Sequence, residues 1–190
     1  MLSQIDLQNL VPQLAPLTRP RSCMMVRASH AQYWRDPLAK KKTSWARARF
    51  NDANGAKILY LGDDYLTSAD ETLVALVPTS IVAFAPVECD LSAVLDLTDG
   101  HVQGMLQTSP AELAANFRSV PSGGPSTPTQ VLGETLAASG QFDGVYYASA
   151  ARQGHFCLAV FIEALGSDPG KLGGKLSVFD PKQGVVETLP

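Results

Sequence analysis

The chain has 190 residues, of which 45% are hydrophobic and 17% are charged, and its formal net charge is −3. Such a chain is long and apolar enough to fold as one domain around its own core. The slightly acidic balance argues against direct binding of nucleic acids, which depends on clustered Lys and Arg side chains. We expect no membrane segment, because no apolar run approaches the ~20 residues that a spanning helix needs.

The cysteines and the N-terminus bear on metal binding and on the compartment. The three cysteines show no spacing typical of a disulfide framework, and without a CxxC pair or clustered histidines we expect no metal site. The first residues lack the early basic charge of a signal peptide. These features favour a reducing, cytoplasmic setting.

Hydrophobic spacing and turn residues predict a mixture of helices and strands. In chain order they are a helix at 5–14 interrupted by Pro12, a strand at 23–26, a polar connection at 29–56, a strand at 58–61, a helix at 68–77, strands at 81–87 and 94–97, helices at 110–117 and 129–138, strands at 145–148 and 156–162, and a hairpin at 175–188. Because these elements follow no regular βαβ rhythm, we expect an α+β fold: a single domain in which helices flank a mixed, mostly antiparallel split sheet. Residues 1–20 would form a helical extension and residues 21–190 the main domain.

The sequence lacks the common motifs of nucleotide-binding and hydrolase folds. No GxGxxG follows a predicted strand, and neither a P-loop motif nor GxSxG occurs. The polar connection contains a basic segment from Arg35 to Arg49, which can be interpreted as a solvated loop or as a site for a small anion such as a dinucleotide. Long ordered connections in compact domains are often functional.

Four polar residues occur in the order Arg, Arg, Glu and Ser near the ends of predicted elements, and short motifs surround them. The four are Arg27, Arg49, Glu71 and Ser149. The accompanying motifs are Asp36-Pro37-Leu38, Arg49-Phe50-Asn51, Leu59-Tyr60-Leu61, Asp96-Leu97-Thr98 and the segment from Asp143 to Ser149. In this order they resemble the RES family, which is named for its Arg, Glu and Ser, and the resemblance runs from about Val26 to Phe179.

The resemblance implies an ADP-ribosyltransferase-like fold and activity on NAD⁺. It implies that the chain is the toxin of a bacterial type II toxin–antitoxin system. The toxin would break the bond between nicotinamide and ribose, with water or phosphate as the acceptor, and would thereby arrest growth. NAD⁺ would be the substrate, and no further cofactor is implied. The alternatives are a mono-ADP-ribosyltransferase that modifies a host protein and a non-catalytic NAD-binding or interaction module. The implied partner is a cognate antitoxin with a helix-turn-helix region, to which any DNA contact would belong.

The resemblance also implies a role for each residue. Arg27 and Arg49 would clamp the diphosphate of NAD⁺, since arginine binds phosphate oxygens in a bidentate, permanently charged geometry. Tyr60 would stack on the nicotinamide ring. Glu71 would stabilise the ribosyl cation-like transition state, and Ser149 would orient the ligand by hydrogen bonding. Arg47 is an alternative to Arg49 as the second anion ligand, because Arg47-Ala48 stands where the family has Gly-Gly.

Each of these residues also has a purely structural interpretation. Ser68 and Glu71 have the spacing of a capping box, so Glu71 could serve only to begin its helix. Tyr60, in an apolar strand, could belong to the core. Arg27 could be a surface arginine, and Ser149 a turn residue. The ordered set favours the functional interpretation.

Three histidines and one further tyrosine remain. His30 and Tyr33 follow Arg27 closely and could line the same pocket. We interpret His101 and His155 as structural.

Overall fold

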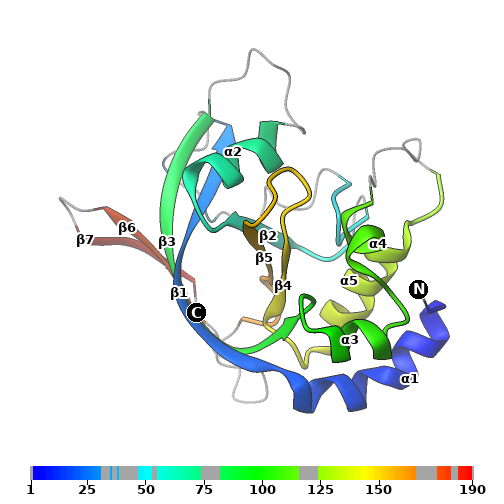
Figure 1. Cartoon of the computed structure of the whole chain (residues 1–190). Coiled ribbons are helices and arrows are strands. Elements are labelled where there is room, and N and C mark those ends of the chain that lie inside the picture. The colour runs from blue at the N-terminus through cyan, green and yellow to red at the C-terminus, as the bar shows by residue number, and fades with distance from the viewer. Residues whose placement is uncertain are drawn as a thin grey trace.

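The computed structural model describes residues 2–30, 35, 38, 47–52, 55–73, 82–115, 124–165, 175–180 and 184–189. Its elements are α1 (Gln4–Leu14), the 3-10 turn η1 (Ala15–Leu17), β1 (Arg19–His30), β2 (Ile58–Gly62), α2 (Tyr65–Leu73), β3 (Val82–Asp96), α3 (Gly100–Met105), α4 (Pro110–Ala114), α5 (Pro128–Ser139), β4 (Gly144–Ala148), β5 (Phe156–Phe161), β6 (Lys175–Asp180) and β7 (Gly184–Leu189). The helices α1, α3, α4 and α5 gather on one side of the strands, and α2 lies apart from them beside β1 and β2 (Figure 1). No helix in the described ranges is long and apolar enough to cross a membrane.

The strands form one sheet that closes on itself. Their order is β1-β2-β5-β4-β3-β6-β7, and β1 also pairs with β3, so five strands make a ring to which the β6–β7 hairpin is added. The sheet is mixed, because β3 and β4 run parallel while β1–β3, β2–β5 and β4–β5 are antiparallel. The expected split sheet is therefore wrong. The physical reason is the length of β1 and β3, which pair from Arg19↔Val94 to His30↔Val82 and close the ring.

The two faces of the sheet pack into two hydrophobic clusters. Along β5, Cys157, Ala159 and Phe161 point into a cluster shared with the helices, whereas Leu158 and Val160 point into a cluster shared with β1, β2 and β3. This alternation is the two-residue period of a strand that is buried on both faces. The helix-side cluster includes Leu7, Val11 and Leu14 of α1, so the N-terminal helix packs into the main core.

Several predicted elements are confirmed. Strands occupy Ile58–Gly62, Gly144–Ala148 and Phe156–Phe161, and a helix occupies Pro128–Ser139. The C-terminal hairpin is present as β6 and β7, which pair antiparallel. The first helix spans Gln4–Leu14 and contains Pro12.

Other boundaries were wrong for identifiable reasons. The two strands expected at 81–87 and 94–97 are the single strand β3, because buried Val87, Cys89 and Leu91 continue the alternation between them. The strand expected at 23–26 is the longer β1. Helix α3 was not predicted; it begins after Asp99, whose side chain accepts from the backbone N–H of His101.

The helix expected at 68–77 begins earlier, at Tyr65. Asp64 caps it, because its Oδ1 atom accepts a hydrogen bond of 2.6 Å from the N–H of Thr67. Ser68 therefore lies inside the helix, and the capping box predicted for Ser68 and Glu71 is wrong.

Candidate functional site

The carboxylate of Glu71 binds the loop that follows β4. Its Oε1 atom accepts a hydrogen bond of 2.7 Å from the hydroxyl of Ser149. The same oxygen accepts from the backbone N–H groups of Ala150, at 2.9 Å, and Ala151, at 3.3 Å. The second oxygen, Oε2, has no hydrogen-bond partner within the described residues. Glu71 therefore has one fixed and one available carboxylate oxygen.

Sheet topology brings these distant segments together. The C-terminal ends of β2 and β4 both flank the start of β5, since Gly62 pairs with Cys157 and Ala148 pairs with Phe156. Helix α2 follows β2 directly, and Ser149 follows β4. The segments that carry Glu71 and Ser149 thus leave the sheet at the same end.

Close contacts hold α2 against the sheet. The hydroxyl of Ser68 donates a hydrogen bond of 3.0 Å to the carbonyl of Val26 on β1. A Cβ atom at Gly62 would lie 2.6 Å from the backbone nitrogen of Ser68, so only glycine permits this approach. Ser68 thus joins the helix to β1, one turn before Glu71.

Ser149 also organises its own loop. Its backbone N–H donates to the carbonyl of His155 at 2.9 Å. Its hydroxyl oxygen accepts from the N–H groups of Ala151, at 3.2 Å, and Arg152, at 3.1 Å. Gly154 completes the loop with a φ of +80°, a conformation that favours glycine. Ser149 is a turn residue and a partner of Glu71 at once.

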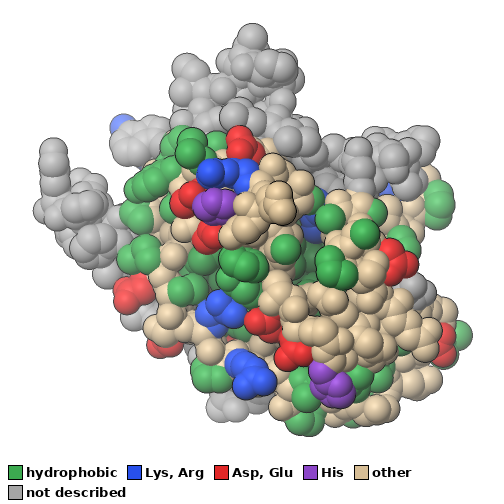
Figure 2. All heavy atoms as spheres, viewed as in Figure 1, with side chains coloured by type: hydrophobic (Ala, Val, Ile, Leu, Met, Phe, Trp, Pro, Cys, Tyr) green, Lys and Arg blue, Asp and Glu red, His purple; other side chains and the backbone are tan. Residues whose placement is uncertain are grey.

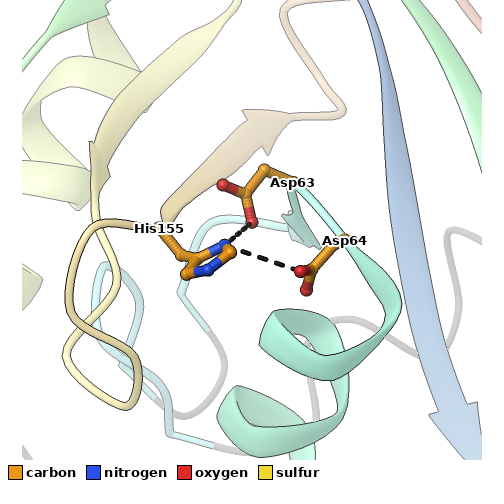
Figure 3. Close-up of side chains that lie close together, drawn as sticks. All are labelled: Asp63, Asp64 and His155. Carbon is orange, nitrogen blue, oxygen red and sulfur yellow. Dashed lines mark hydrogen bonds and ion pairs between the residues drawn. The ribbon is translucent and has the colours of Figure 1, made fainter.

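Ion pairs connect this loop to the junction between β2 and α2. His155 Nδ1 lies 3.2 Å from Asp63 Oδ1 and 3.5 Å from Asp64 Oδ2, and the three side chains converge from the two segments (Figure 3). Arg152 Nη1 lies 3.1 Å from Asp64 Oδ1. Asp63 Oδ2 also accepts from the N–H of Phe156 at 2.9 Å. We call Asp63, Asp64, Arg152 and His155 the loop clasp.

The clasp is better described by ion pairs than by a metal site. Ligand atoms of Asp63, Asp64 and His155 lie within 4.8 Å of one another, close enough in principle to share a cation. However, Arg152 already provides a positive charge at Asp64. On the face shown in Figure 2, histidine, acidic and basic side chains lie together in the upper part of the described surface.

Arg27 is a largely buried cation, and one of its N–H groups has no acceptor among the described residues. Its Nη1 atom donates a hydrogen bond of 2.9 Å to the carbonyl of Tyr60. Although part of the side chain reaches the surface, the Nε atom is buried and has no hydrogen-bond partner among the described residues. Burial lowers the pKa of Arg27 to about 10, so the guanidinium remains charged at neutral pH. An unpaired buried donor is costly, and an anion would satisfy it.

Arg49 is buried and holds the chain ahead of β2 against α4. Its Nη1 atom donates to the carbonyl of Leu113 at 2.7 Å and to that of Ala115 at 3.3 Å. Arg47 turns instead toward α5, where its Nε atom donates to Gln130 Oε1 at 3.1 Å. Arg47 Nε also lies 3.3 Å from Asp52 Oδ1, and Nη2 donates to the carbonyl of Pro125.

The hydroxyl of Tyr60 is fixed by two partners. It donates to Asn51 Oδ1 at 2.8 Å and accepts from the N–H of Phe50 at 2.9 Å. Burial raises the pKa of Tyr60 well above its usual range, and the positive charges of Arg49 and Arg27 oppose this shift. Both arginines therefore lie close enough to Tyr60 to affect its pKa.

Tyr147 lies near Arg49, Tyr60 and Glu71, because all three affect its pKa. Burial raises the pKa of Tyr147, the neighbouring Cys157, Glu71 and Tyr60 raise it further, and the charge of Arg49 lowers it. Arg27 and Arg49 thus lie near Tyr60, and Arg49 and Glu71 lie near Tyr147.

The structure describes two candidate residues less fully. His30 is the last residue of β1, where its backbone pairs with Val82, and its side chain lies outside the description. Tyr33 lies outside the described residues, as do Asp36 and Pro37 of the first motif. Leu38 of that motif is buried.

A hollow between α1 and α5 is lined by none of the candidate residues named above. It has a volume of about 530 Å³ and is lined by α1 and α5, including Gln8, Glu134 and Gln141. Glu134 is committed to the fold, because its carboxylate accepts from the N–H groups of Asp52, at 2.9 Å, and Ala56, at 2.8 Å. The groups suited to a charged ligand lie instead around Glu71 and Arg27.

The chain is similar to a known family in sequence and to a solved structure in fold. The family model for the RES domain matches residues 24–171. No curated protein matches the chain in sequence. Among solved structures, a chain from the crystal structure of the M. tuberculosis MbcT–MbcA toxin–antitoxin complex is similar, with a TM-score of 0.61 and 17% identity over 96% of this chain and 92% of that chain. At this identity the likeness concerns the fold.

Proposed function

The chain belongs to the RES-domain family, and from this premise we propose that it cleaves the bond between nicotinamide and ribose in NAD⁺ as the toxin of a toxin–antitoxin pair. The fold likeness to a chain of the MbcT–MbcA toxin–antitoxin complex supports the toxin role. The proposal includes an ADP-ribosyltransferase-like fold and a cognate antitoxin, with a helix-turn-helix region, that restrains the activity.

The observation that carries the proposal is the geometry of Glu71. Three donors hold its Oε1 atom, which leaves Oε2 available for a ligand. When nicotinamide departs with the electron pair of the glycosidic bond, positive charge develops on the ribose. A fixed carboxylate that accepts a hydrogen bond from a ribose hydroxyl offsets that charge without reorganising. Glu71 is therefore the residue that stabilises the transition state.

The arginines account for the other end of the substrate. The unpartnered Nε of Arg27 would donate to a diphosphate oxygen, and its retained charge would attract that anion. Arg49, whose charge also acts on Tyr60, would add a second positive charge. The edge or face of the Tyr60 ring would contact nicotinamide while its hydroxyl stays bound to Asn51.

The leaving group explains why the site requires no proton donor. The nicotinamide ring in NAD⁺ is cationic and departs as a neutral molecule. Cysteine chemistry is equally unnecessary, since burial raises the pKa of Cys157, beneath Glu71, to about 12 and keeps it a thiol.

The test is to incubate purified chain, freed of any antitoxin, with NAD⁺ alone, with NAD⁺ and phosphate, and with NAD⁺ and cell lysate. Mass spectrometry would then identify the products. Nicotinamide with ADP-ribose means hydrolysis, nicotinamide with ADP-ribose-1″-phosphate means phosphorolysis, and ADP-ribose attached to lysate proteins means transfer to a host target. Intact NAD⁺ in all three settings would contradict the proposal and leave a non-catalytic module.

A further inference from the structure

Two of the three cysteines face each other across adjacent strands. Cys23 on β1 and Cys89 on β3 are direct partners in the antiparallel register. Directly opposed side chains lie on the same face of a sheet, with Cβ atoms about 4.5–5.5 Å apart and closer in non-hydrogen-bonded pairs. A disulfide needs a Cβ separation of about 3.5–4.5 Å. Both residues are free thiols, and a small approach of the two strands would allow a bond between them.

The two thiols differ in exposure and acidity in a way that suits oxidation. Cys23 is half-buried and Cys89 is fully buried. The neighbouring Cys89 lowers the pKa of Cys23 to about 7, against the opposing effect of burial, and the charge of Arg21 contributes less. The thiolate is the nucleophile in thiol chemistry, so the accessible member of the pair is also the reactive one.

We propose that Cys23 and Cys89 form a reversible intramolecular disulfide when the protein meets hydrogen peroxide. The Cys23 thiolate attacks a peroxide oxygen, hydroxide leaves, and Cys23 becomes a sulfenic acid. The Cys89 sulfur then attacks the Cys23 sulfur, and the sulfenic oxygen leaves as water with the Cys89 proton. In total, two thiols and one peroxide yield one disulfide and two waters, and two electrons pass to the peroxide. A small dithiol reverses the reaction by exchange.

The third cysteine provides an internal contrast. Cys157 lies in the helix-side cluster, on β5, and has no cysteine opposite it, since it pairs with Gly62 and Tyr147. Burial raises its pKa to about 12, so it carries little thiolate at neutral pH. Oxidation should therefore be selective for the Cys23–Cys89 pair.

The disulfide would restrain a large part of the chain. The loop between Cys23 and Cys89 contains β2 and α2, including Glu71. Closing a loop of this length reduces the entropy of the unfolded chain, while β1 and β3 are already paired in the folded state. The oxidised protein should therefore unfold at a temperature higher by roughly 5–10 °C.

The experiment treats the native full chain with hydrogen peroxide, then measures intact mass and maps peptides without reduction. We expect the loss of two hydrogen atoms, a linked peptide containing Cys23 and Cys89, and reversal by dithiothreitol. Cys157→Ala should lose two hydrogen atoms on oxidation, as the wild type does. Cys23→Ala should show no such loss of mass. A linked peptide that contains Cys157, a disulfide between two copies of the chain, or Cys23 oxidised with Cys89 still free would overturn the proposal. If a variant fails to fold, the peptide map of the oxidised wild type alone tests the proposal.

Discussion

The Glu71 carboxylate accepts a hydrogen bond of 2.7 Å from the Ser149 hydroxyl, although 78 positions separate the two residues in the chain. The contact exists because α2 and the loop after β4 leave the sheet beside the same end of β5. It replaces the local capping role that the spacing of Ser68 and Glu71 suggests. A glutamate whose one oxygen is fixed by a distant loop, and whose other oxygen is available, is suited to contact a ligand.

Replacing Arg27 by Lys tests the phosphate-binding role. Lysine keeps the charge but loses the planar fork, so one or two charge-assisted hydrogen bonds to the ligand are lost. We expect NAD⁺ to bind roughly 10–100-fold more weakly. Calorimetry in a Glu71→Gln background measures this affinity without turnover. The matched control is Arg19→Lys, at the exposed start of the same strand; equal affinities of the two variants would rule out the assignment.

Variants of Tyr60 separate its hydroxyl from its ring. Tyr60→Phe leaves the N–H of Phe50 and the Oδ1 of Asn51 without their partner, which should cost about 1–3 kcal/mol in the free energy of unfolding. Its ring remains, so the KM for NAD⁺ should change little. Tyr60→Leu removes the ring and should raise that KM. If the two folded variants have the same KM, ring stacking has no part in binding.

The approach of α5 to the loop of Arg49 depends on Gly133. A Cβ atom there would lie 2.0 Å from the carbonyl oxygen of Phe50, which is backbone and must move. Gly133→Ala should therefore lower stability by about 1–3 kcal/mol and reduce activity by displacing Arg49. Gly104→Ala is the control, because nothing lies within 4 Å of its Cβ position and alanine favours a helix. Urea unfolding that finds Gly133→Ala as stable as Gly104→Ala would contradict this packing.

Asp64 can be tested as a cap and as part of the loop clasp. Asn caps helices about as well as Asp, whereas Ala does not, so Asp64→Ala should cost about 1 kcal/mol more than Asp64→Asn. Both lose the ion pairs with Arg152 and His155, so both should loosen the Ser149 loop. Faster hydrogen exchange at Ala150 and Ala151 in both variants would report this. Unchanged exchange would show that the clasp does not hold the loop.

The same residue predicts how stability depends on pH. A hydrogen bond from the N–H of Thr67 lowers the pKa of Asp64 below its usual value of 3.8. A carboxyl with a depressed folded-state pKa stabilises the protein above its unfolded pKa, and that contribution is lost as the pH falls through the folded value. Wild-type stability should therefore decline below about pH 4, and the decline should be shallower in Asp64→Asn. Parallel pH profiles in urea would contradict the assignment.

Local pattern predicted those elements whose signals are contained in a few residues. The apolar run around Leu59 and the capped helix before Gly140 were found in this way, because alternation, capping residues and turn residues suffice to define them. Strand β3 is longer than the two predicted strands, and the polar residues Glu88, Asp90 and Ser92 lie in the stretch between them. The residues that alternate with them along the strand, Val87, Cys89, Leu91 and Ala93, are buried. This is the pattern of a half-exposed strand.

The candidate site was predicted only as a set of residues. The family pattern selected Arg27, Arg49, Glu71 and Ser149, but it contained no information on their partners. The clasp residues Asp63 and Asp64 have no local sequence signal, because their contacts with Arg152 and His155 come from a loop distant in the chain. Closure of the sheet likewise depends on the pairing of β1 with β3, which no local signal specifies.

The most direct test of the NAD⁺-cleaving site is the rate of nicotinamide release by the wild type, Glu71→Gln and Glu163→Gln. Glutamine keeps the size of Glu71 and can still accept hydrogen bonds from the Ser149 loop, but it lacks the charge that offsets the cationic transition state. Glu163 is an exposed partner of Lys57 beyond the other end of β5 and serves as the matched control. We predict release by the wild type and Glu163→Gln, and a rate about 10²–10³-fold lower for a folded Glu71→Gln. Equal rates for the wild type and Glu71→Gln would contradict the role assigned to Glu71.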